Sequence, residues 1–216
     1  NNVGIRYALA QGFGQILLLN NDTLVDPYFL KPLQTELQAS RYGVVQPLIC
    51  FVQDPKKLWS AGGKWNALLG RAITLGDRVS LDNYAPKHLE LDWATGCCML
   101  LSKEAILAAG LLDEHYFAYF EDVEWSLRIR KSGFKIGLAE NSIIYHEAGA
   151  ASKKAQEEGT LSPTVFYFHV RNQLFLLRQQ QVVGAHPLGP QRREDQGAVA
   201  VVLPGHRIFV AFAPPV

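Results

Sequence analysis

The amino-acid sequence predicts an α/β protein in which a mostly parallel sheet is flanked by helices. Three segments, residues 15–19, 43–50 and 135–145, are predicted to be strands, and the first is a short continuous apolar run typical of a buried strand. Segments with apolar residues at helical spacing precede the first of these strands, at residues 5–13, and the last of them, at residues 121–132. Strands that alternate with helices along a chain indicate a sheet covered on both faces.

The first half of the chain is predicted to form a helix, a strand, a helix and a strand, at residues 5–13, 15–19, 27–40 and 43–50. Gly12 and Gly14 end the first helix, because glycine is the usual residue after the last turn. Pro27 suits the first turn of the second helix. The glycine-spaced stretch 59–84 is predicted to consist of loops and short strands.

The second half continues with a strand, two helices, a strand and a last helix, at residues 92–101, 103–109, 121–132, 135–145 and from Pro163 onward. Beyond about residue 183, glycine, proline, alanine and valine dominate, and only 198–203 and 207–212 look regular. The sequence therefore predicts a domain at residues 1–183 and a divergent or irregular tail at 184–216. Because the chain opens directly on a helix, we expect the first strand of the sheet to be absent.

The overall composition is that of a soluble globular protein. Hydrophobic residues make up 48% and charged residues 19%, and a net charge of +1 gives no global attraction for nucleic acid. No apolar run approaches the roughly 18–20 residues that span a bilayer. Cys97 and Cys98 are adjacent, a poor arrangement for a structural disulfide, so we expect the reducing cytoplasm. A peripheral position on the inner face of the membrane is compatible with this composition.

Polar residues follow two of the predicted strands at their carboxyl ends. Asn20 and Asp22 come directly after the run 15–19, and His146 follows the run 135–145. Ligands of open α/β sheets collect at that edge, where a carboxylate can hold Mg²⁺ or Mn²⁺ together with substrate phosphate oxygens. An imidazole suits manganese better than magnesium. The alternatives are that Asn20 to Asp22 cap the following helix and that His146 is an ordinary core or surface residue.

Two carboxylates, Glu121 and Asp122, follow an aromatic run and begin the predicted helix 121–132. One interpretation is structural, since acidic residues at a helix N-terminus contribute about 0.3–1 kcal/mol each through the macrodipole. The other is functional: an ionised carboxylate beside a cleft accepts the proton of an attacking hydroxyl. The segment with Trp93 and Gly96 suits a sugar-binding platform, or else Trp93 is core and Gly96 a bulge.

Taken together, these segments resemble the family-2 glycosyltransferases of the GT-A fold, especially the rhamnosyltransferase-like branch. The order of the motifs carries the resemblance, which covers about residues 1–180: Asn2-Val3-Gly4 with Ala8 and Gly12, Leu18-Leu19-Asn20-Asn21-Asp22-Thr23, Trp59-Ser60-Ala61-Gly62-Gly63, Trp93-Ala94-Thr95-Gly96, Gly110-Leu111-Leu112-Asp113-Glu114, Tyr116-Phe117, Tyr119-Phe120-Glu121-Asp122-Val123-Glu124, Arg128, Gly133 and His146. In that family a strand and a turn that grip the nucleotide come first. The resemblance therefore implies a GT-A-like sheet that is incomplete at its N-terminus.

The resemblance implies roles for the residues of the metal and base motifs. Asn20 and Asp22 would stand where the Asp-x-Asp pair of the family meets the donor diphosphate and a divalent metal, Mn²⁺ or Mg²⁺. Asp22 and His146 would be the metal ligands. Asp122 would be the catalytic base, with Glu121 nearby on the acceptor side.

Further roles follow from the remaining motifs of the resemblance. Asn2 and Gly4 would lie beside the nucleotide and help to bind the donor. Trp93 and Gly96 would shape the acceptor pocket. Arg128 would be a structural partner for the acidic residues rather than a catalyst.

The function that the resemblance implies is an inverting, metal-dependent transfer of a sugar from a nucleotide diphosphate-sugar to an acceptor hydroxyl. The acceptor would be a glycan or a lipid-linked intermediate in cell-surface polysaccharide synthesis, and the branch suggests dTDP-rhamnose as donor. The alternative is an inactive transferase fragment or a glycan-binding module without turnover. A nucleotidyltransferase would carry a glycine- and lysine-rich phosphate loop, which the sequence lacks.

Overall fold

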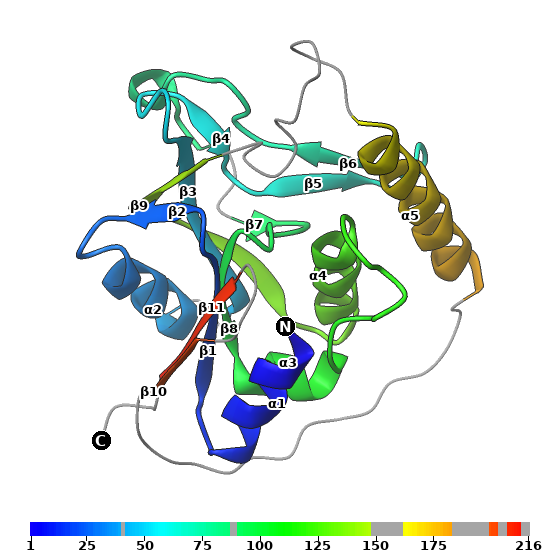
Figure 1. Ribbon diagram of the computed structural model, residues 1–216, viewed down its shortest axis with the longest axis horizontal. Coiled ribbons are helices and arrows are strands. Elements are labelled where there is room, and N and C mark those ends of the chain that lie inside the picture. Colours follow the sequence, from blue (N-terminus) through cyan, green and yellow to red (C-terminus); the bar gives the residue numbers. More distant parts are fainter. Residues whose placement is uncertain (40–41, 87–89, 148–161, 183–198, 203–206, 213–216) are drawn as a thin grey trace.

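The computed structural model describes residues 1–39, 42–86, 90–147, 162–182, 199–202 and 207–212. Its main feature is a nine-stranded sheet with helices on both faces (Figure 1). The strands of this sheet are β1 (Gln15–Asn20), β2 (Thr23–Val25), β3 (Tyr42–Phe51), β4 (Leu58–Ser60), β7 (Glu90–Leu91), β8 (Cys98–Ser102), β9 (Lys135–His146), β10 (Val199–Val202) and β11 (Arg207–Phe212). A separate two-stranded ribbon consists of β5 (Gly63–Asn66) and β6 (Arg71–Thr74).

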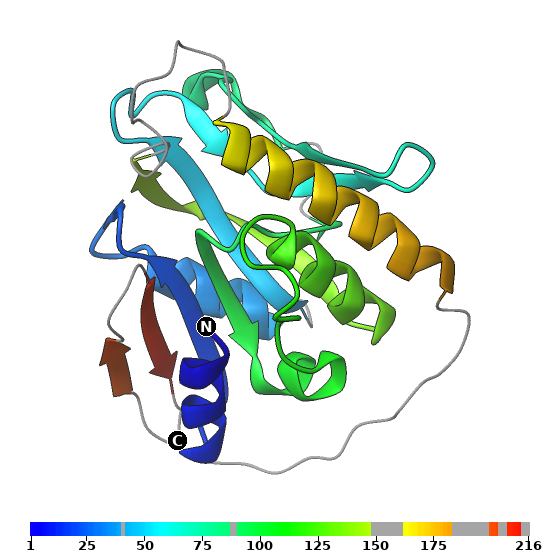
Figure 2. The same cartoon turned by 45° about the vertical axis from the view of Figure 1, so that its right-hand side comes forward.

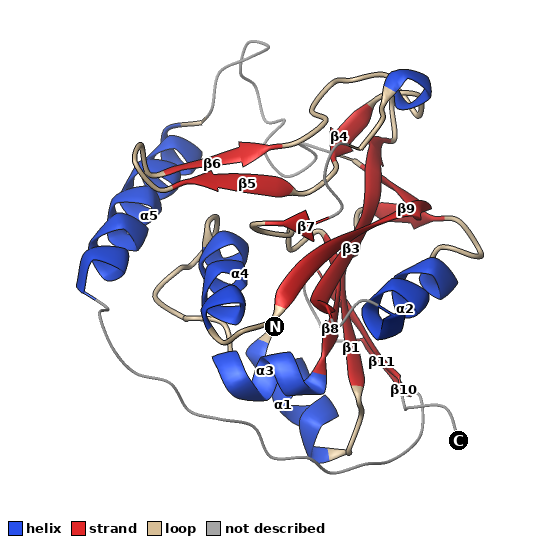
Figure 3. Cartoon of the chain, turned by 180° about the vertical axis from the view of Figure 1, so that it is seen from behind, coloured by secondary structure: helices blue, strands red, loops and turns tan. Residues whose placement is uncertain are grey.

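The helices divide between the two faces of the sheet. They are α1 (Asn2–Ala10), α2 (Leu30–Ala39), α3 (Lys103–Ala109), α4 (Glu121–Lys131) and α5 (Pro163–Val182), with a short 3-10 helix η1 (Leu81–Asn83). Helix α2 covers one face, and α1, α3 and α4 lie on the other (Figure 3). Helix α5 lies outside this layer, alongside α4 and the β5–β6 ribbon (Figure 2). None of these helices in the described part of the chain is long and apolar enough to cross a membrane.

The hydrophobic core lies on both faces of the sheet because the central strands are apolar along their whole length. In β1, Ile16 and Leu18 pack into the cluster that includes α1, α3 and α4. Leu17 and Leu19, which point the opposite way, pack against α2. The run 15–19 is therefore a buried central strand, as the sequence predicts.

The sheet is mixed, with one parallel pair among the described strands, whereas the sequence predicts a mostly parallel sheet. Its strand directions place the candidate site. Strands β3 and β9 are parallel neighbours, whereas β8 lies between β1 and β3 and is antiparallel to both. The other strand pairs in the described residues are antiparallel. Strands β1, β3 and β9 consequently run in the same direction, so their carboxyl ends lie at one edge of the sheet.

Most of the predicted elements are confirmed. The first helix covers Asn2–Ala10 instead of residues 5–13, and two further elements differ for local reasons. Helix α2 begins at Leu30, not at Pro27, because Asp26 accepts a hydrogen bond from the Tyr28 N–H and makes a turn before the helix. The predicted strand 92–101 is confirmed only over β8. Its first half is a loop, because the backbone N–H groups of residues 94–97 donate to side chains instead of a neighbouring strand.

The predicted tail adds strands to the same sheet. Strands β10 and β11 pair with each other, and β11 is antiparallel to β1 over residues 15–20. This pairing covers the β1 edge that faces away from β8, and so satisfies backbone groups that an open edge would leave unpaired. Residues 183–198, where the predicted tail begins, lie outside the described residues.

Candidate active site

Asp22 and His146 meet at the carboxyl edge of the sheet. Strand β2 follows β1 after a tight turn and pairs with the end of β9, with Thr23 opposite His146. The Thr23 hydroxyl donates to the Asn20 carbonyl over 2.6 Å and so closes this turn. As a result, Asp22 Oδ1 lies 3.3 Å from His146 Nε2. The structure thus brings together two residues that the sequence places at separate strand ends.

His146 is held in a nearly closed environment. Its side chain is only 9% exposed, and the Trp59 ring packs edge-on against it with centroids 4.5 Å apart. Burial lowers the pKa of His146 below its ordinary value, while the Asp22 carboxylate acts in the opposite direction. The net effect favours the neutral imidazole, which is the form that binds a metal.

The chemistry of this pair fits a divalent cation. Two ligand atoms about 2.1 Å from an octahedral Mg²⁺, on adjacent corners, lie about 3 Å apart, close to the separation of Asp22 Oδ1 and His146 Nε2. Asn20 Oδ1 and His146 Nδ1 are buried without a hydrogen-bond partner among the described residues. The part of the chain that the structure describes contains no group of three or more His, Cys, Asp or Glu side chains that could hold a metal ion. A cation beside Asp22 and His146 therefore needs further ligands, such as phosphate oxygens.

A loop whose backbone is held by side chains connects this pair to α4. Four consecutive backbone N–H groups each donate to a side-chain oxygen: Ala94 to Ser126 over 3.2 Å, Thr95 to Gln46 over 2.8 Å, Gly96 to Asp122 over 2.9 Å and Cys97 to Thr95 over 3.3 Å. The Cys97 carbonyl in turn accepts from the Asn20 N–H over 2.8 Å. The loop therefore ties the end of β1 to the first turn of α4.

Asp122 is fixed by two backbone donors at the start of α4. Its Oδ2 accepts from the Gly96 N–H over 2.9 Å, and its Oδ1 accepts from the Val123 N–H over 2.8 Å. An ionised carboxylate has about four acceptor positions, so capacity remains for a substrate hydroxyl. Glu121 is the residue before it and begins the helix, with its Oε2 buried. Both carboxylates lie in the first turn of α4, at the positive end of the helix dipole.

Trp93 lies in the core and presents no open face to a sugar. It is 6% exposed and packs in a cluster with Tyr116, Val123 and Leu127. Its indole N–H donates to the Lys64 carbonyl over 3.2 Å. The platform interpretation of Trp93 is therefore wrong and the core interpretation is correct. Gly96, by contrast, lies on the loop that contacts Asp122. The predicted role of Gly96 on the acceptor side stays a prediction.

Asn2 joins α1 to the segment that precedes α4. Its amide nitrogen donates to the Leu112 carbonyl and to Glu114 Oε1, both over 2.9 Å. Its amide oxygen accepts from the Leu112 N–H over 3.1 Å. Gly4 is buried on the same helix. These contacts are all within the protein, and the donor-binding role of Asn2 and Gly4 stays a prediction.

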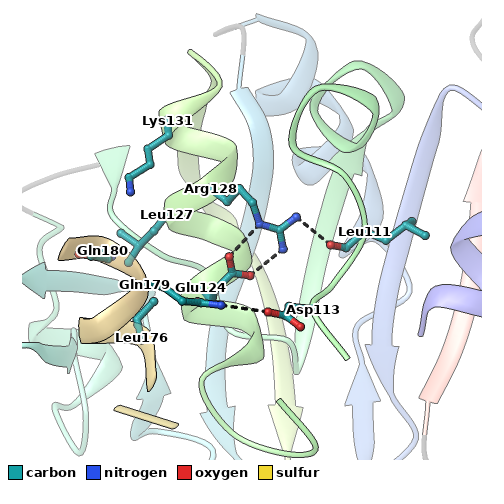
Figure 4. Close-up of a pocket in the computed structure, with 9 residues that line it drawn as sticks. All are labelled: Leu111, Asp113, Glu124, Leu127, Arg128, Lys131, Leu176, Gln179 and Gln180. Atoms are coloured by element: carbon teal, nitrogen blue, oxygen red, sulfur yellow. Dashed lines mark hydrogen bonds and ion pairs between the residues drawn. The ribbon is translucent and has the colours of Figure 1, made fainter. Parts of the chain in front are cut away.

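Arg128 is a structural residue, as the sequence predicts. Its guanidinium makes two hydrogen bonds to Glu124, over 2.8 and 2.6 Å, and donates to the Leu111 carbonyl (Figure 4). It also donates to the Ala109 carbonyl. A pocket beside this pair lies between α4 and α5 and contains none of the candidate site residues. Its lining residues are Leu111, Asp113, Glu124, Leu127, Arg128, Lys131, Leu176, Gln179 and Gln180.

Sequence reasoning missed the side chains that support the 94–97 loop. Gln46 is fully buried in β3, where its amide oxygen holds the Thr95 N–H, and its amide nitrogen contacts Ser60. Ser126 on α4 holds the Ala94 N–H. A single polar residue within the apolar run 43–50 was the signal for Gln46, because buried polar groups are almost always hydrogen-bonded. Ser126 carries no comparable signal.

Residues 3–160 match the family model described as glycosyltransferase like family 2. Because this match covers more than half of the chain, the protein belongs to that family of glycosyltransferases. The family resemblance of the motifs and the GT-A-like α/β fold are thereby confirmed.

Three proteins of known name are similar to this chain in sequence. The chain is 29% identical over 138 residues to a low-salt glycan biosynthesis hexosyltransferase of Haloferax volcanii, covering 63% of this chain and 44% of that protein. It is 26% identical over 186 residues to a dTDP-rhamnosyl transferase of Shigella flexneri, covering 84% and 59%. It is 29% identical over 69 residues to an N-acetylglucosaminyl-diphospho-decaprenol L-rhamnosyltransferase of Mycobacterium tuberculosis, covering 32% and 22%. The chain thus spans about half the length of the first two relatives.

Proposed function

We propose that this protein transfers a sugar from a nucleotide diphosphate-sugar to a hydroxyl of a glycan or lipid-linked acceptor, with inversion at the sugar carbon. The observation that carries the proposal is the approach of Asp22 and His146 to 3.3 Å at the carboxyl edge of the sheet. Asp122 is linked to the same edge through the 94–97 loop. The names of the relatives, a hexosyltransferase and two rhamnosyltransferases, support this class of reaction.

At the donor end, Asp22 and His146 would hold Mn²⁺ or Mg²⁺, with the buried Asn20 amide oxygen beside them. A divalent cation bound there would offset the negative charge that grows on the departing diphosphate. The neutral state of His146, favoured by its burial, leaves a ring nitrogen available as a ligand. Asp22 supplies the one carboxylate that a cation held mainly by phosphate oxygens requires.

At the acceptor end, Asp122 would act as the general base. As the acceptor oxygen forms its bond to the sugar carbon, the bond from that carbon to the diphosphate breaks on the opposite face. The hydroxyl proton passes to the Asp122 carboxylate, whose orientation is set by the Gly96 and Val123 N–H groups. Glu121 would face the acceptor side of the same site.

The relatives suggest substrates for a first assay. One is named for a dTDP-rhamnosyl donor and another for an N-acetylglucosaminyl-diphospho-decaprenol acceptor. We propose a donor and acceptor of these chemical classes for this protein. A lipid-linked acceptor would place the enzyme at the cytoplasmic face of a membrane as a peripheral protein.

Calorimetric titration with dTDP and UDP tests the donor site. We expect binding in the presence of Mn²⁺ that is lost with EDTA, and at least about tenfold weaker binding in Asp22→Ala and His146→Ala. Asp54→Ala is the matched control, because Asp54 is an exposed carboxylate paired with Lys57. Metal-independent binding, or equal binding by all variants, would contradict the assignment. No binding by the wild type would favour the inactive or glycan-binding alternative.

The base assignment is tested by Asp122→Asn, which keeps the size of the side chain. Loss of a general base lowers the rate by about 10²–10⁴-fold. We expect this loss in the release of dTDP from dTDP-rhamnose with N-acetylglucosaminyl-diphospho-decaprenol as acceptor, whereas binding of dTDP and Mn²⁺ stays unchanged. Turnover at the wild-type rate in Asp122→Asn would refute the assignment.

A further inference from the structure

The chain enters α4 through two strained residues. Among the described residues, the non-glycine positions with positive φ are Arg78, Tyr119 and Phe120, the last two both at 67°. This left-handed conformation is unfavourable for residues with a large side chain, and it persists only where surrounding contacts impose it. Phe120 is the residue that precedes the first turn of α4, so its conformation sets the direction in which the helix begins.

Asn172 on α5 supplies the contacts that impose this turn. Its side chain is fully buried, and its amide nitrogen donates to the Ala118 carbonyl over 2.7 Å and to the Tyr119 carbonyl over 2.8 Å. Its amide oxygen accepts from the Arg171 guanidinium over 2.7 Å. Every polar atom of the Asn172 amide is therefore engaged, and both of its donors hold the strained turn.

Neighbouring residues of α5 cover the same turn. Arg171 also donates to the His115 carbonyl over 3.1 Å. The His169 ring packs at a tilt against Tyr119 with centroids 4.4 Å apart and meets Phe120 edge-on at 5.9 Å. One face of α5 thus packs on the segment that leads into α4.

We propose that Asn172 is a positioning residue for Asp122, an inference that rests on the function proposed above. By holding the Ala118 and Tyr119 carbonyls, Asn172 keeps the turn left-handed and so fixes the first turn of α4. That turn carries Asp122, whose carboxylate must meet the Gly96 N–H. Without the amide, the part-buried carbonyls of Ala118 and Tyr119 lose their donor and the turn relaxes, which displaces the carboxylate. A misplacement of about 1 Å is enough to lower a rate by about 10²-fold.

The adjacent residue provides a matched control. Gln173 also lies on α5 and also donates its amide N–H to a backbone carbonyl, that of Gly70, over 2.8 Å. That carbonyl belongs to the turn between β5 and β6, not to the turn before α4. Gln173→Ala therefore removes a comparable contact between α5 and the rest of the protein without touching Ala118 or Tyr119.

The kinetic test compares Asn172→Ala, Gln173→Ala, Asp122→Asn and the Asn172→Ala/Asp122→Asn double variant. With dTDP-rhamnose and N-acetylglucosaminyl-diphospho-decaprenol, we expect Asn172→Ala to lower kcat by about 10²-fold. Its Kd for dTDP with Mn²⁺ should stay within about threefold of wild type, because Asp22 and His146 of the proposed donor site lie just after β1 and at the end of β9, and not on α4 or α5. Gln173→Ala should change neither value by more than about threefold. The double variant should be no slower than Asp122→Asn, since both changes act through one group.

A second measurement does not depend on turnover. Hydrogen exchange at the Gly96 N–H reports its bond to Asp122, and we expect it to become at least about tenfold faster in Asn172→Ala but not in Gln173→Ala. Unchanged exchange, a kcat within threefold of wild type, equal losses in both alanine variants, or joint loss of kcat and dTDP binding would each overturn the inference. Wild-type turnover in Asp122→Asn would instead refute the proposed base, which distinguishes the two failures.

Discussion

Replacing Arg128 by leucine tests how the base-bearing helix is anchored. The Arg128 side chain is 30% exposed and its partner Glu124 is 11% exposed, so the pair is largely desolvated. The guanidinium also satisfies the Ala109 carbonyl at the end of α3 and the Leu111 carbonyl in the connection to α4. Arg128→Leu keeps most of the apolar volume, but it leaves the Glu124 carboxylate and two carbonyls without these donors.

The size of the effect follows from this burial. Breaking a fully buried ion pair by removing one partner costs about 3–5 kcal/mol. Because Arg128 is partly exposed, water recovers some of that loss, and we expect the free energy of unfolding to fall by about 2–4 kcal/mol. The ion pair between Lys135 and Glu90 has side chains that are 60% and 46% exposed, so Lys135→Ala should lower the free energy of unfolding much less than Arg128→Leu does.

Equilibrium unfolding in urea measures these differences, since urea, unlike guanidinium chloride, leaves ion pairs unscreened. The double variant Arg128→Leu/Glu124→Leu should recover part of the loss, because it removes the uncompensated carboxylate. An Arg128→Leu variant within about 1 kcal/mol of wild type would refute the reasoning, as would a double variant less stable than Arg128→Leu alone.

Three further predictions follow from buried contacts. In Gly63→Ala, the new Cβ would lie 1.9 Å from the Trp93 ring, so we expect a loss of about 1–3 kcal/mol in urea unfolding and altered tryptophan fluorescence; unchanged values would contradict this close packing. Gln46→Leu leaves the Thr95 N–H without its acceptor and should cost about 1–3 kcal/mol, a prediction that fails if the variant is as stable as wild type. Burial lowers the pKa of His169 below its ordinary value of 6.5, although the negative charge of Asp122 on α4 acts in the opposite direction. As the pH falls, His169 is therefore protonated in the unfolded chain before it is protonated in the folded protein, and the folded protein loses stability below about pH 6.5. His169→Phe should reduce the fall in stability between pH 7.5 and 5.5, and an identical fall in both proteins would contradict it.

The sequence alone determined the elements and the class of the protein. Apolar runs and helical spacing predicted β1, β3, β9, α3 and α4 closely, because the burial of a strand or of a helix face is written into local composition. Polar residues at the ends of two apolar runs were enough to predict that Asn20, Asp22 and His146 belong to one edge of the sheet. The order of short motifs was enough for the family, which the match over residues 3–160 confirms.

Contacts between distant segments were decided only by the tertiary structure. The strand order and the β2–β9 pairing bring Asp22 to His146, and local propensity carries no information about either. The same holds for Gly96 and Asp122, and for Trp93, whose burial depends on α4 and α5 packing over it. A residue's type shows what it can donate, accept or bury, whereas its partner depends on the register and packing of elements far apart in the chain.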